Sequence, residues 1–386
     1  MALDTKWTHL QDYVDTTPKQ RTDYELISAD SHVNEPPDLW LPRMPAKFKD
    51  RAPRMEHFER GHAWVLEGVT EPIPFGRNAC AGLGPYEGDT WIEWDAVRPG
   101  GWNPAARLQE QDVDGVDAEV LFPTPRLSHS LFANKDAEFH NALVRAYNDW
   151  LSEYSAHAPD RLVGVAIIPN RGVEAAVAEV ERCATLPGIR AFLVGQYPHG
   201  SLEIAAEDDA VWSAVEATGY PLCLHVSMTD TMPGAHRATG REGVARFLDV
   251  PGRIEEFIYT GVMRRHPTLQ LGFIEVDAGW VPYFKEQADN RWIRNSPKLR
   301  SERGLDRPPS SYFERIHFTY LTDRYALRNR HAVGIHQLMW SSDYPHGGSD
   351  YPLSRRVIEG DFQEIPADEK QLILSGNAAR LFRLGR

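Results

Sequence analysis

The chain has 386 residues, of which 42% are hydrophobic and 25% charged, as is usual for a soluble globular protein with a sizeable core. Its formal charge of −13 at pH 7, with no long basic block, argues against binding to nucleic acid or to anionic membranes. No stretch approaches the ~18 apolar residues of a membrane span, and the N-terminus lacks a secretory signal pattern. The three cysteines are widely spaced and form no C-x-x-C pair. We therefore expect a cytoplasmic protein that binds neither nucleic acid nor membrane.

Residues 1–23 are polar and show no helical period, so we expect an N-terminal arm there. Over residues 24–386, short apolar runs rich in branched side chains alternate with segments of helical period, which is typical of βα units. Eight such runs favour a closed (β/α)8 TIM barrel over an open sheet. The expected strands lie near 26–30, 117–122, 162–168, 189–194, 221–225, 270–275, 315–319 and 337–342.

Helices are expected at 137–156, 174–183 and 368–382, from apolar spacing and helix propensity. Between the first two strands lies a long stretch rich in proline, glycine and tryptophan. A structureless loop of this length is uncommon inside a compact domain. We therefore predict an insertion at about 41–105 that forms a subdomain or a lid over the strand ends.

Three of the expected strands end in side chains that commonly bind metals. Asp30 and His32 stand two residues apart in the first strand, where side chains of alternate residues share a face. His225 ends the fifth strand, and Asp343 follows the eighth. The carboxyl ends of barrel strands meet at the active face. Singly, each residue is better explained as a core histidine or a helix cap, but one metal ion explains all three strand ends together. Two carboxylates and two imidazoles suit Zn, Mn or Fe(II).

The chain resembles the amidohydrolase-2 family, which includes the aminocarboxymuconate semialdehyde, γ-resorcylate and related non-oxidative decarboxylases. The segments that carry the resemblance are 28–32, 225, 272–283, 342–346 and 376–382, in family order. The resemblance implies a barrel with a single divalent ion, held here by Asp30, His32, His225 and Asp343. It also makes a homodimer or homotetramer the expected assembly.

Two positions depart from the family pattern. Many relatives have His-x-His on the first strand, where this chain has Asp30. The decarboxylases place a catalytic histidine just after the sixth strand, where this chain has Glu275, Val276 and Asp277. Without that histidine, hydrolysis and decarboxylation are equally supported.

Three further residues are candidates for the same site. Glu275 is the best candidate for general base, although a salt bridge with an arginine is an equal alternative. His346 is expected either to act as an acid or substrate contact, or to be a solvated loop residue. Glu35 is expected to hydrogen-bond a ligand histidine or, less readily, to bind a second metal.

These observations predict a metal-dependent hydrolase or non-oxidative decarboxylase that acts on a small organic carboxylic acid, aromatic acids included. The cofactor is expected to be one divalent ion of Zn, Mn or Fe. Two alternatives stay open. One is a dinuclear non-haem iron oxygenase of the same fold, with Glu35, Glu275 and His346 as extra ligands. The other is a barrel that serves as an inactive scaffold or partner subunit.

Overall fold

The computed structural model describes residues 24–82, 91–226, 228, 245–302, 304–305 and 307–385. The arm expected at 1–23 lies outside the described residues. None of the helices in the described ranges is both long and apolar enough to cross a bilayer.

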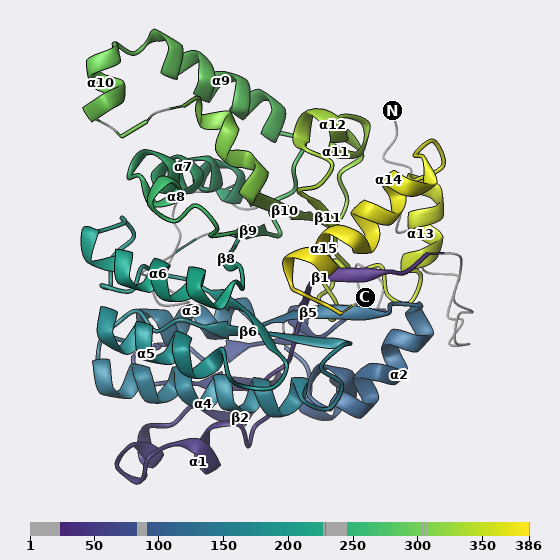
Figure 1. Cartoon of the computed structure of the whole chain (residues 1–386). Coiled ribbons are helices and arrows are strands. Elements are labelled where there is room, and N and C mark those ends of the chain that lie inside the picture. Colours follow the sequence, from purple (N-terminus) through teal and green to yellow (C-terminus); the bar gives the residue numbers. More distant parts are fainter. Residues whose placement is uncertain are drawn as a thin grey trace.

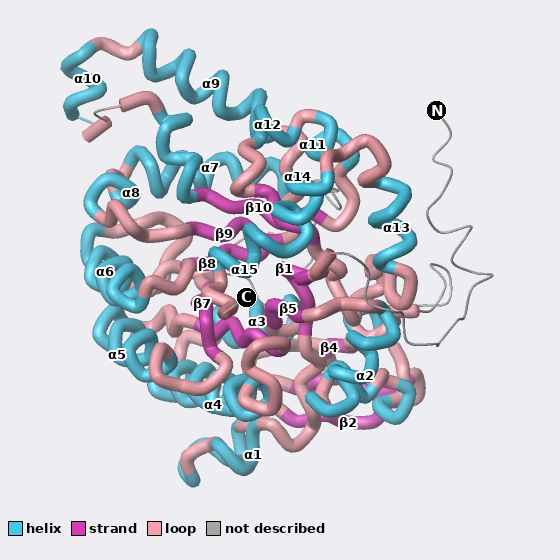
Figure 2. Tube along the Cα trace, turned by 45° about the vertical axis from the view of Figure 1, so that its right-hand side comes forward, coloured by secondary structure: helices cyan, strands magenta, loops and turns pink. Residues whose placement is uncertain are grey.

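Eight parallel strands form the centre of the molecule, in the order β1-β5-β6-β7-β8-β9-β10-β11. Their bounds are β1 Ile27–His32, β5 Ala118–Phe122, β6 Leu162–Ile167, β7 Ile189–Leu193, β8 Leu222–His225, β9 Leu271–Ile274, β10 Ile316–Tyr320 and β11 Leu338–Trp340. Each coincides with an expected strand to within about two residues. Helices surround these strands, as Figures 1 and 2 show. The predicted (β/α)8 barrel is confirmed.

The helices follow the expected alternation with the strands. Their bounds are α1 Trp40–Arg43, α2 Pro104–Asp114, α3 Pro125–Ala133, α4 Ala137–Ser155, α5 Val173–Cys183, α6 Asp209–Thr218, α7 Ala245–Tyr259, α8 Val262–Arg265, α9 Val281–Arg294, α10 Pro297–Glu302, α11 Arg324–Arg328, α12 Arg330–Val333, α13 Ser354–Asp361, α14 Ala367–Gln371 and α15 Asn377–Leu381. Short 3-10 turns lie at Ala46–Arg51, Gly76–Asn78, Trp94–Ala96, Pro99–Gly101, Ala206–Asp208 and Pro309–Arg315. A π-turn at Leu372–Gly376 joins α14 to α15, so the last expected helix forms in three pieces.

Local sequence explains where the second helix begins and ends. The Asn103 side chain accepts hydrogen bonds from the backbone N–H groups of Ala105 and Ala106, and Pro104 occupies the first helical position. Gly115 ends the helix with a left-handed φ of 75°, which costs glycine little. This helix carries Arg107, which is fully buried.

The barrel closes between β1 and the loop that follows β11. The Asp343 N–H donates to the carbonyl of Asp30 (3.0 Å), and the His32 N–H donates to the carbonyl of Tyr344 (2.6 Å). The Ser342 N–H donates to the hydroxyl of Ser28 (2.9 Å). Closure of the seam therefore brings the residues at the end of the eighth strand against those of the first.

The chain between β1 and β5 forms a small three-stranded antiparallel sheet of β2 Arg54–Phe58, β3 Gly61–Val65 and β4 Ile73–Pro74. The segment that follows β4 then returns to the barrel. The Ala81 N–H donates to Pro345 O, and the Gly347 N–H donates to Arg77 O, both at 3.0 Å. The predicted insertion thus contacts the loop after the eighth strand, while its role as a lid stays a prediction.

Candidate metal centre

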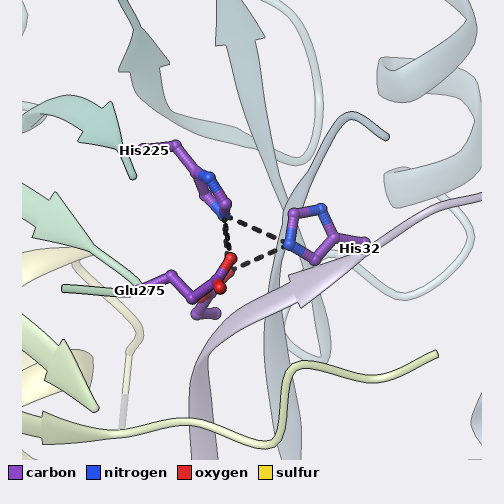
Figure 3. Close-up of side chains that lie close together, drawn as sticks. His32, His225 and Glu275 are labelled. Carbon is purple, nitrogen blue, oxygen red and sulfur yellow. Dashed lines mark hydrogen bonds and ion pairs between the residues drawn. The ribbon is translucent and has the colours of Figure 1, made fainter. Parts of the chain in front are cut away.

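Side chains from four strand ends meet at the mouth of the barrel. Asp30 and His32 come from β1, His225 is the last residue of β8, Glu275 follows β9, and Asp343 lies three residues after β11. In Figure 3, His32, His225 and Glu275 come from different strands and point toward one another. The convergence expected from barrel topology is therefore present in the geometry, although the role of each residue as a ligand stays a prediction.

The first strand is not regular between its two candidate ligands. Ser28 pairs with Glu119 and Ser31 pairs with Leu121, so β1 carries one residue more than β5 across this stretch. Such a bulge re-aims side chains next to active sites. Simple alternation does not describe this strand, but Asp30 and His32 still share a target, since Asp30 Oδ1 lies 3.4 Å from His32 Nε2.

The distances between the four candidate ligands match those around an ion. His32 Nε2 lies 3.3 Å from Asp343 Oδ1 and 3.2 Å from His225 Nε2. His225 Nε2 lies 3.4 Å from Asp30 Oδ1. Four donors at about 2.1 Å from a tetrahedral ion are separated by about 3.4 Å. The donor atoms of Asp30, His32 and His225 are therefore spaced to bind one common cation, and Asp343 adjoins them at His32.

Within the part of the chain that the structure describes, the carboxylate of Asp30 has no hydrogen-bond donor to stabilise its negative charge. Asp30 is fully buried, and neither of its carboxylate oxygens has a hydrogen-bond partner among the described residues. Burial raises the pKa of Asp30 to about 7, against the opposing effect of His32. Burial also raises the pKa of Asp343, but the imidazoles of His346 and His32 outweigh it and lower that pKa below its usual range. A buried carboxylate without donors is costly, and a divalent cation removes that cost.

A backbone contact sets the orientation of His32. Its Nδ1 lies 2.9 Å from the carbonyl oxygen of Pro123, which can only accept a hydrogen bond, so Nδ1 carries the proton. The Nε2 lone pair then faces the other ligands, as in metal sites whose histidines are fixed by a carbonyl. Burial, and then the neighbouring His346, lowers the pKa of His32 to about 4. His32 is therefore neutral, which is the form that binds metals.

His346 lies inside the site and is 7% exposed, not a solvated loop residue. Its ring stacks on His32 with centroids 3.9 Å apart, and its Nδ1 lies 2.8 Å from Asp343 Oδ1. Its Nε2 accepts from the amide of Asn78 at 3.0 Å. Asn78 belongs to the insertion and was not identified from the sequence, because nothing in its local pattern marks it.

Glu275 is the most accessible acid of the site, with 21% of its side chain exposed. Its Oε2 lies 3.8 Å from His225 Nε2, and its N–H donates to the hydroxyl of Thr319 (2.7 Å). Glu275 and Asp343 have φ values of 59° and 54°, and Val226, after β8, has 54°. A left-handed residue other than glycine costs of order 1 kcal/mol or more, and such strain gathers at functional sites. Three of the four strand ends at the site, those of β8, β9 and β11, are thus followed by a residue in this conformation.

Glu35 is buried near the site but does not contact the imidazole of His32. Its Oε1 accepts from the backbone N–H of Thr124 at 2.9 Å, and burial raises its pKa. The position beside His32 Nδ1 is held by Pro123 instead. Glu35 therefore contacts the backbone next to the carbonyl that orients His32, and not the imidazole.

A small, largely apolar pocket opens beside His225, between α3 and the end of β7. Its lining is formed by Pro123, Pro125, Ser128, His129, Phe132, Leu193, Val194, Gly195 and His225. Its volume of about 20 Å³ admits a molecule of the size of water beside His225.

Known proteins share both the sequence pattern and the fold. The Amidohydro_2 (amidohydrolase) family model matches residues 29–384. The chain is 27% identical over 295 residues to 2-amino-3-carboxymuconate-6-semialdehyde decarboxylase of Dictyostelium discoideum, covering 73% of this chain and 77% of that protein.

Two solved structures show the same architecture. One is an amidohydrolase of Mycobacterium avium subsp. paratuberculosis (TM-score 0.72, 19% identity, 94% of this chain and 100% of that chain). The other is a dihydroxybenzoic acid decarboxylase of Polaromonas sp. with bound manganese and the inhibitor 2-nitroresorcinol (TM-score 0.64, 19% identity, 94% and 98%). With the family model matching nearly the whole barrel, this chain belongs to the Amidohydro_2 family of amidohydrolases.

Proposed function

We propose that this protein is a metal-dependent, non-oxidative decarboxylase of a small aromatic carboxylic acid. The observation that carries the proposal is the meeting of two ligand groups at His32, Asp30 with His225 on one side and Asp343 on the other, together with the buried carboxylate of Asp30, which has no hydrogen-bond partner among the described residues. The relatives supply the reaction class, since decarboxylases are among both the sequence relatives and the structural neighbours.

One divalent ion fits the donor set better than two. The candidate ligands fall into two overlapping groups, Asp30, His32, His225 and Glu275 in one and His32, Asp343 and His346 in the other. Both groups depend on His32, whose Nδ1 is occupied by the Pro123 carbonyl, so that only Nε2 is available. A single nitrogen lone pair serves one ion. The dinuclear iron alternative is therefore less well supported, and the manganese of the Polaromonas enzyme makes manganese the first ion to test.

Asp30, His32, His225 and Asp343 would hold this ion. When bound, it supplies positive charge that anchors the substrate carboxylate and an adjacent oxygen. Glu275 lies on the accessible side of the site, beside His225, where it can exchange protons with water. In the proposed step, protonated Glu275 gives its proton to the ring carbon that bears the carboxylate. CO2 then leaves, the carbon–carbon bonding pair returns to the ring, and water reprotonates Glu275.

Hydrolysis is the second candidate, and Glu275 itself favours it. This glutamate occupies the region in which the related decarboxylases place a catalytic histidine, and a carboxylate is a suitable base for water. In that reaction Glu275 would take a proton from water as the hydroxide attacks a carbonyl carbon. The two reactions differ in their products, since only decarboxylation releases CO2.

The test uses protein reconstituted with manganese and a panel of hydroxybenzoic acids labelled with ¹³C at the carboxyl carbon. We expect release of labelled CO2 and, in D2O, one deuterium at the vacated ring carbon. Glu275→Gln should lose this activity, whereas Glu286→Gln, on the exposed face of α9, should keep it. Hydrolysis of ester or amide analogues without CO2 release would replace the proposal by the second candidate.

We also infer a cytoplasmic homodimer or homotetramer that takes a small carboxylate as its only partner. Support for the compartment comes from three buried free cysteines, and support for the small-molecule partner comes from the acidic net charge. Light scattering coupled to size exclusion would measure the assembly, and a monomeric mass would contradict this inference.

A further inference from the structure

We propose that Arg107, on α2, is a positioning residue that sets the separation between the metal ligands of the first and eighth strands. The metal in this proposal is that of the proposed function. The Arg107 side chain is fully buried. Its Nη1 donates to the carbonyl of His32 at 2.9 Å, and its Nη2 donates to the carbonyl of Tyr344 at 3.4 Å. Tyr344 directly follows Asp343, so one guanidinium contacts the backbone of both ligand segments.

This position is sensitive because the seam is the one join between neighbouring barrel strands, among the described residues, that has no strand ladder. The other neighbouring strands are joined by parallel ladders, whereas β1 and β11 are joined by contacts of the loop that follows β11. The carbonyl of Tyr344 accepts from the His32 N–H as well as from Arg107. The rigid fork of a guanidinium can span two such carbonyls at once, which a lysine ammonium cannot do with the same geometry.

Glu119, on β5, is a second charged group that holds Arg107 in place. Glu119 Oε2 accepts from Arg107 Nε at 2.5 Å and from Gln111 Nε2 at 2.7 Å. Glu119 Oε1 accepts from the hydroxyl of Ser31 at 3.0 Å, and Ser31 lies between the two candidate ligands of β1. The pair of Arg107 and Glu119 therefore contacts the bulged strand as well as the seam.

The cost of this pair supports a role beyond stability. Arg107 is fully buried and Glu119 is 2% exposed. Removing two such charges from water costs several kcal/mol per ion, and a buried ion pair is often no more stabilising than packed apolar side chains. In this protein the ion pair fixes the positions of two backbone carbonyls that belong to the segments carrying the metal ligands. Positional errors of about 0.5 Å already matter in such sites.

A matched control lies at the opposite end of the same two strands. Arg355 is 5% exposed, pairs with buried Asp117 at 3.2 Å and donates to the carbonyls of Gly115 and Tyr24. Asp117 accepts from the N–H of Leu26, which precedes β1. Arg355 is thus a buried, paired arginine of the same kind, remote from the site.

The experiment compares Arg107→Lys and Arg355→Lys with the unmodified protein by calorimetric titration of Mn²⁺ and by crystal structures of the metal-free proteins. Arg107→Lys should bind Mn²⁺ about 10-fold or more weakly, since outer partners of ligands typically change affinity 10- to 100-fold. Its Asp343 should shift relative to His32 by about 0.5 Å or more. Arg355→Lys should leave both quantities unchanged. Glu119→Gln serves as a second variant if Arg107→Lys does not fold, with the same direction expected.

Equal losses of affinity in Arg107→Lys and Arg355→Lys, or an unshifted seam in the metal-free Arg107→Lys protein, would overturn the proposal. If the unmodified protein binds no divalent ion, the proposed metal-dependent function fails by itself. The metal-free crystal structures still decide whether Arg107 positions the two ligand segments.

Discussion

Replacing Asp30 by asparagine should stabilise the metal-free protein and remove its response to metal. The pKa of Asp30 rises from 3.8 to about 7 through burial. The folded chain thus holds the proton of Asp30 more tightly than the unfolded chain does. The stabilisation that this proton provides is present in full below about pH 4 and is lost as the pH rises through 7. Three pKa units correspond to on the order of 4 kcal/mol. An asparagine carries no charge, and its amide can donate toward His32 Nε2, 3.4 Å away.

Urea unfolding in EDTA at pH 8 and pH 5 measures the first effect. Asp30→Asn should be more stable than the unmodified protein at pH 8, and the gain should shrink at pH 5. With Mn²⁺ at 100 times its Kd, the unmodified protein should gain about 2.7 kcal/mol and Asp30→Asn almost nothing. Asp114→Asn is the control: Asp114 is also buried with a pKa of about 7, but it bonds Ser354, so its metal response should be normal. A metal-free Asp30→Asn protein that is less stable than the unmodified protein at pH 8 would show that the buried charge of Asp30 does not destabilise the metal-free fold.

Three further outcomes are expected. Glu275→Gln should lower kcat at least about 100-fold while retaining Mn²⁺ in elemental analysis, because it removes a proton donor; a normal kcat would exclude this role. Asn78→Ala should lower kcat about 10-fold with Mn²⁺ affinity nearly unchanged, since His346 loses the amide that orients it; unchanged kinetics would show that His346 needs no such support. Burial lowers the pKa of His140 to about 4, with Leu131 O and the Asn170 N–H as its partners. The unfolded chain binds this proton first, so the contribution of His140 to the unfolding free energy should fall by about 2 kcal/mol from pH 7 to pH 5, and His140→Gln should remove this part of the pH dependence.

The strands and the convergence of site residues could be predicted because both follow from local pattern and barrel topology. An apolar run ended by His225 or Asp343 marks a strand end, and parallel strands in a barrel bring such ends together. The bulge in β1 could not be predicted, because it depends on the register that Glu119 and Leu121 adopt opposite Ser28 and Ser31.

The contacts that support the candidate ligands could not be predicted from the sequence either. Asn78 reaches His346 through the path of the insertion, and Arg107 reaches the seam from the helix before β5. Pro123 orients His32 through a backbone carbonyl, a group that every residue carries. Such partners are defined by tertiary arrangement and leave no spacing in the sequence. The residues that contact ligands are therefore harder to identify than the ligands themselves.

Elemental analysis of the purified protein, combined with oxygen and CO2 measurements during turnover of a hydroxybenzoic acid, tests most directly whether one divalent ion supports a non-oxidative decarboxylation. We predict close to one divalent ion per chain, release of CO2 and no consumption of oxygen. Two irons per chain with oxygen consumption would contradict this prediction in favour of an oxygenase. Full turnover by protein stripped of metal would contradict the role assigned to Asp30, His32, His225 and Asp343 altogether.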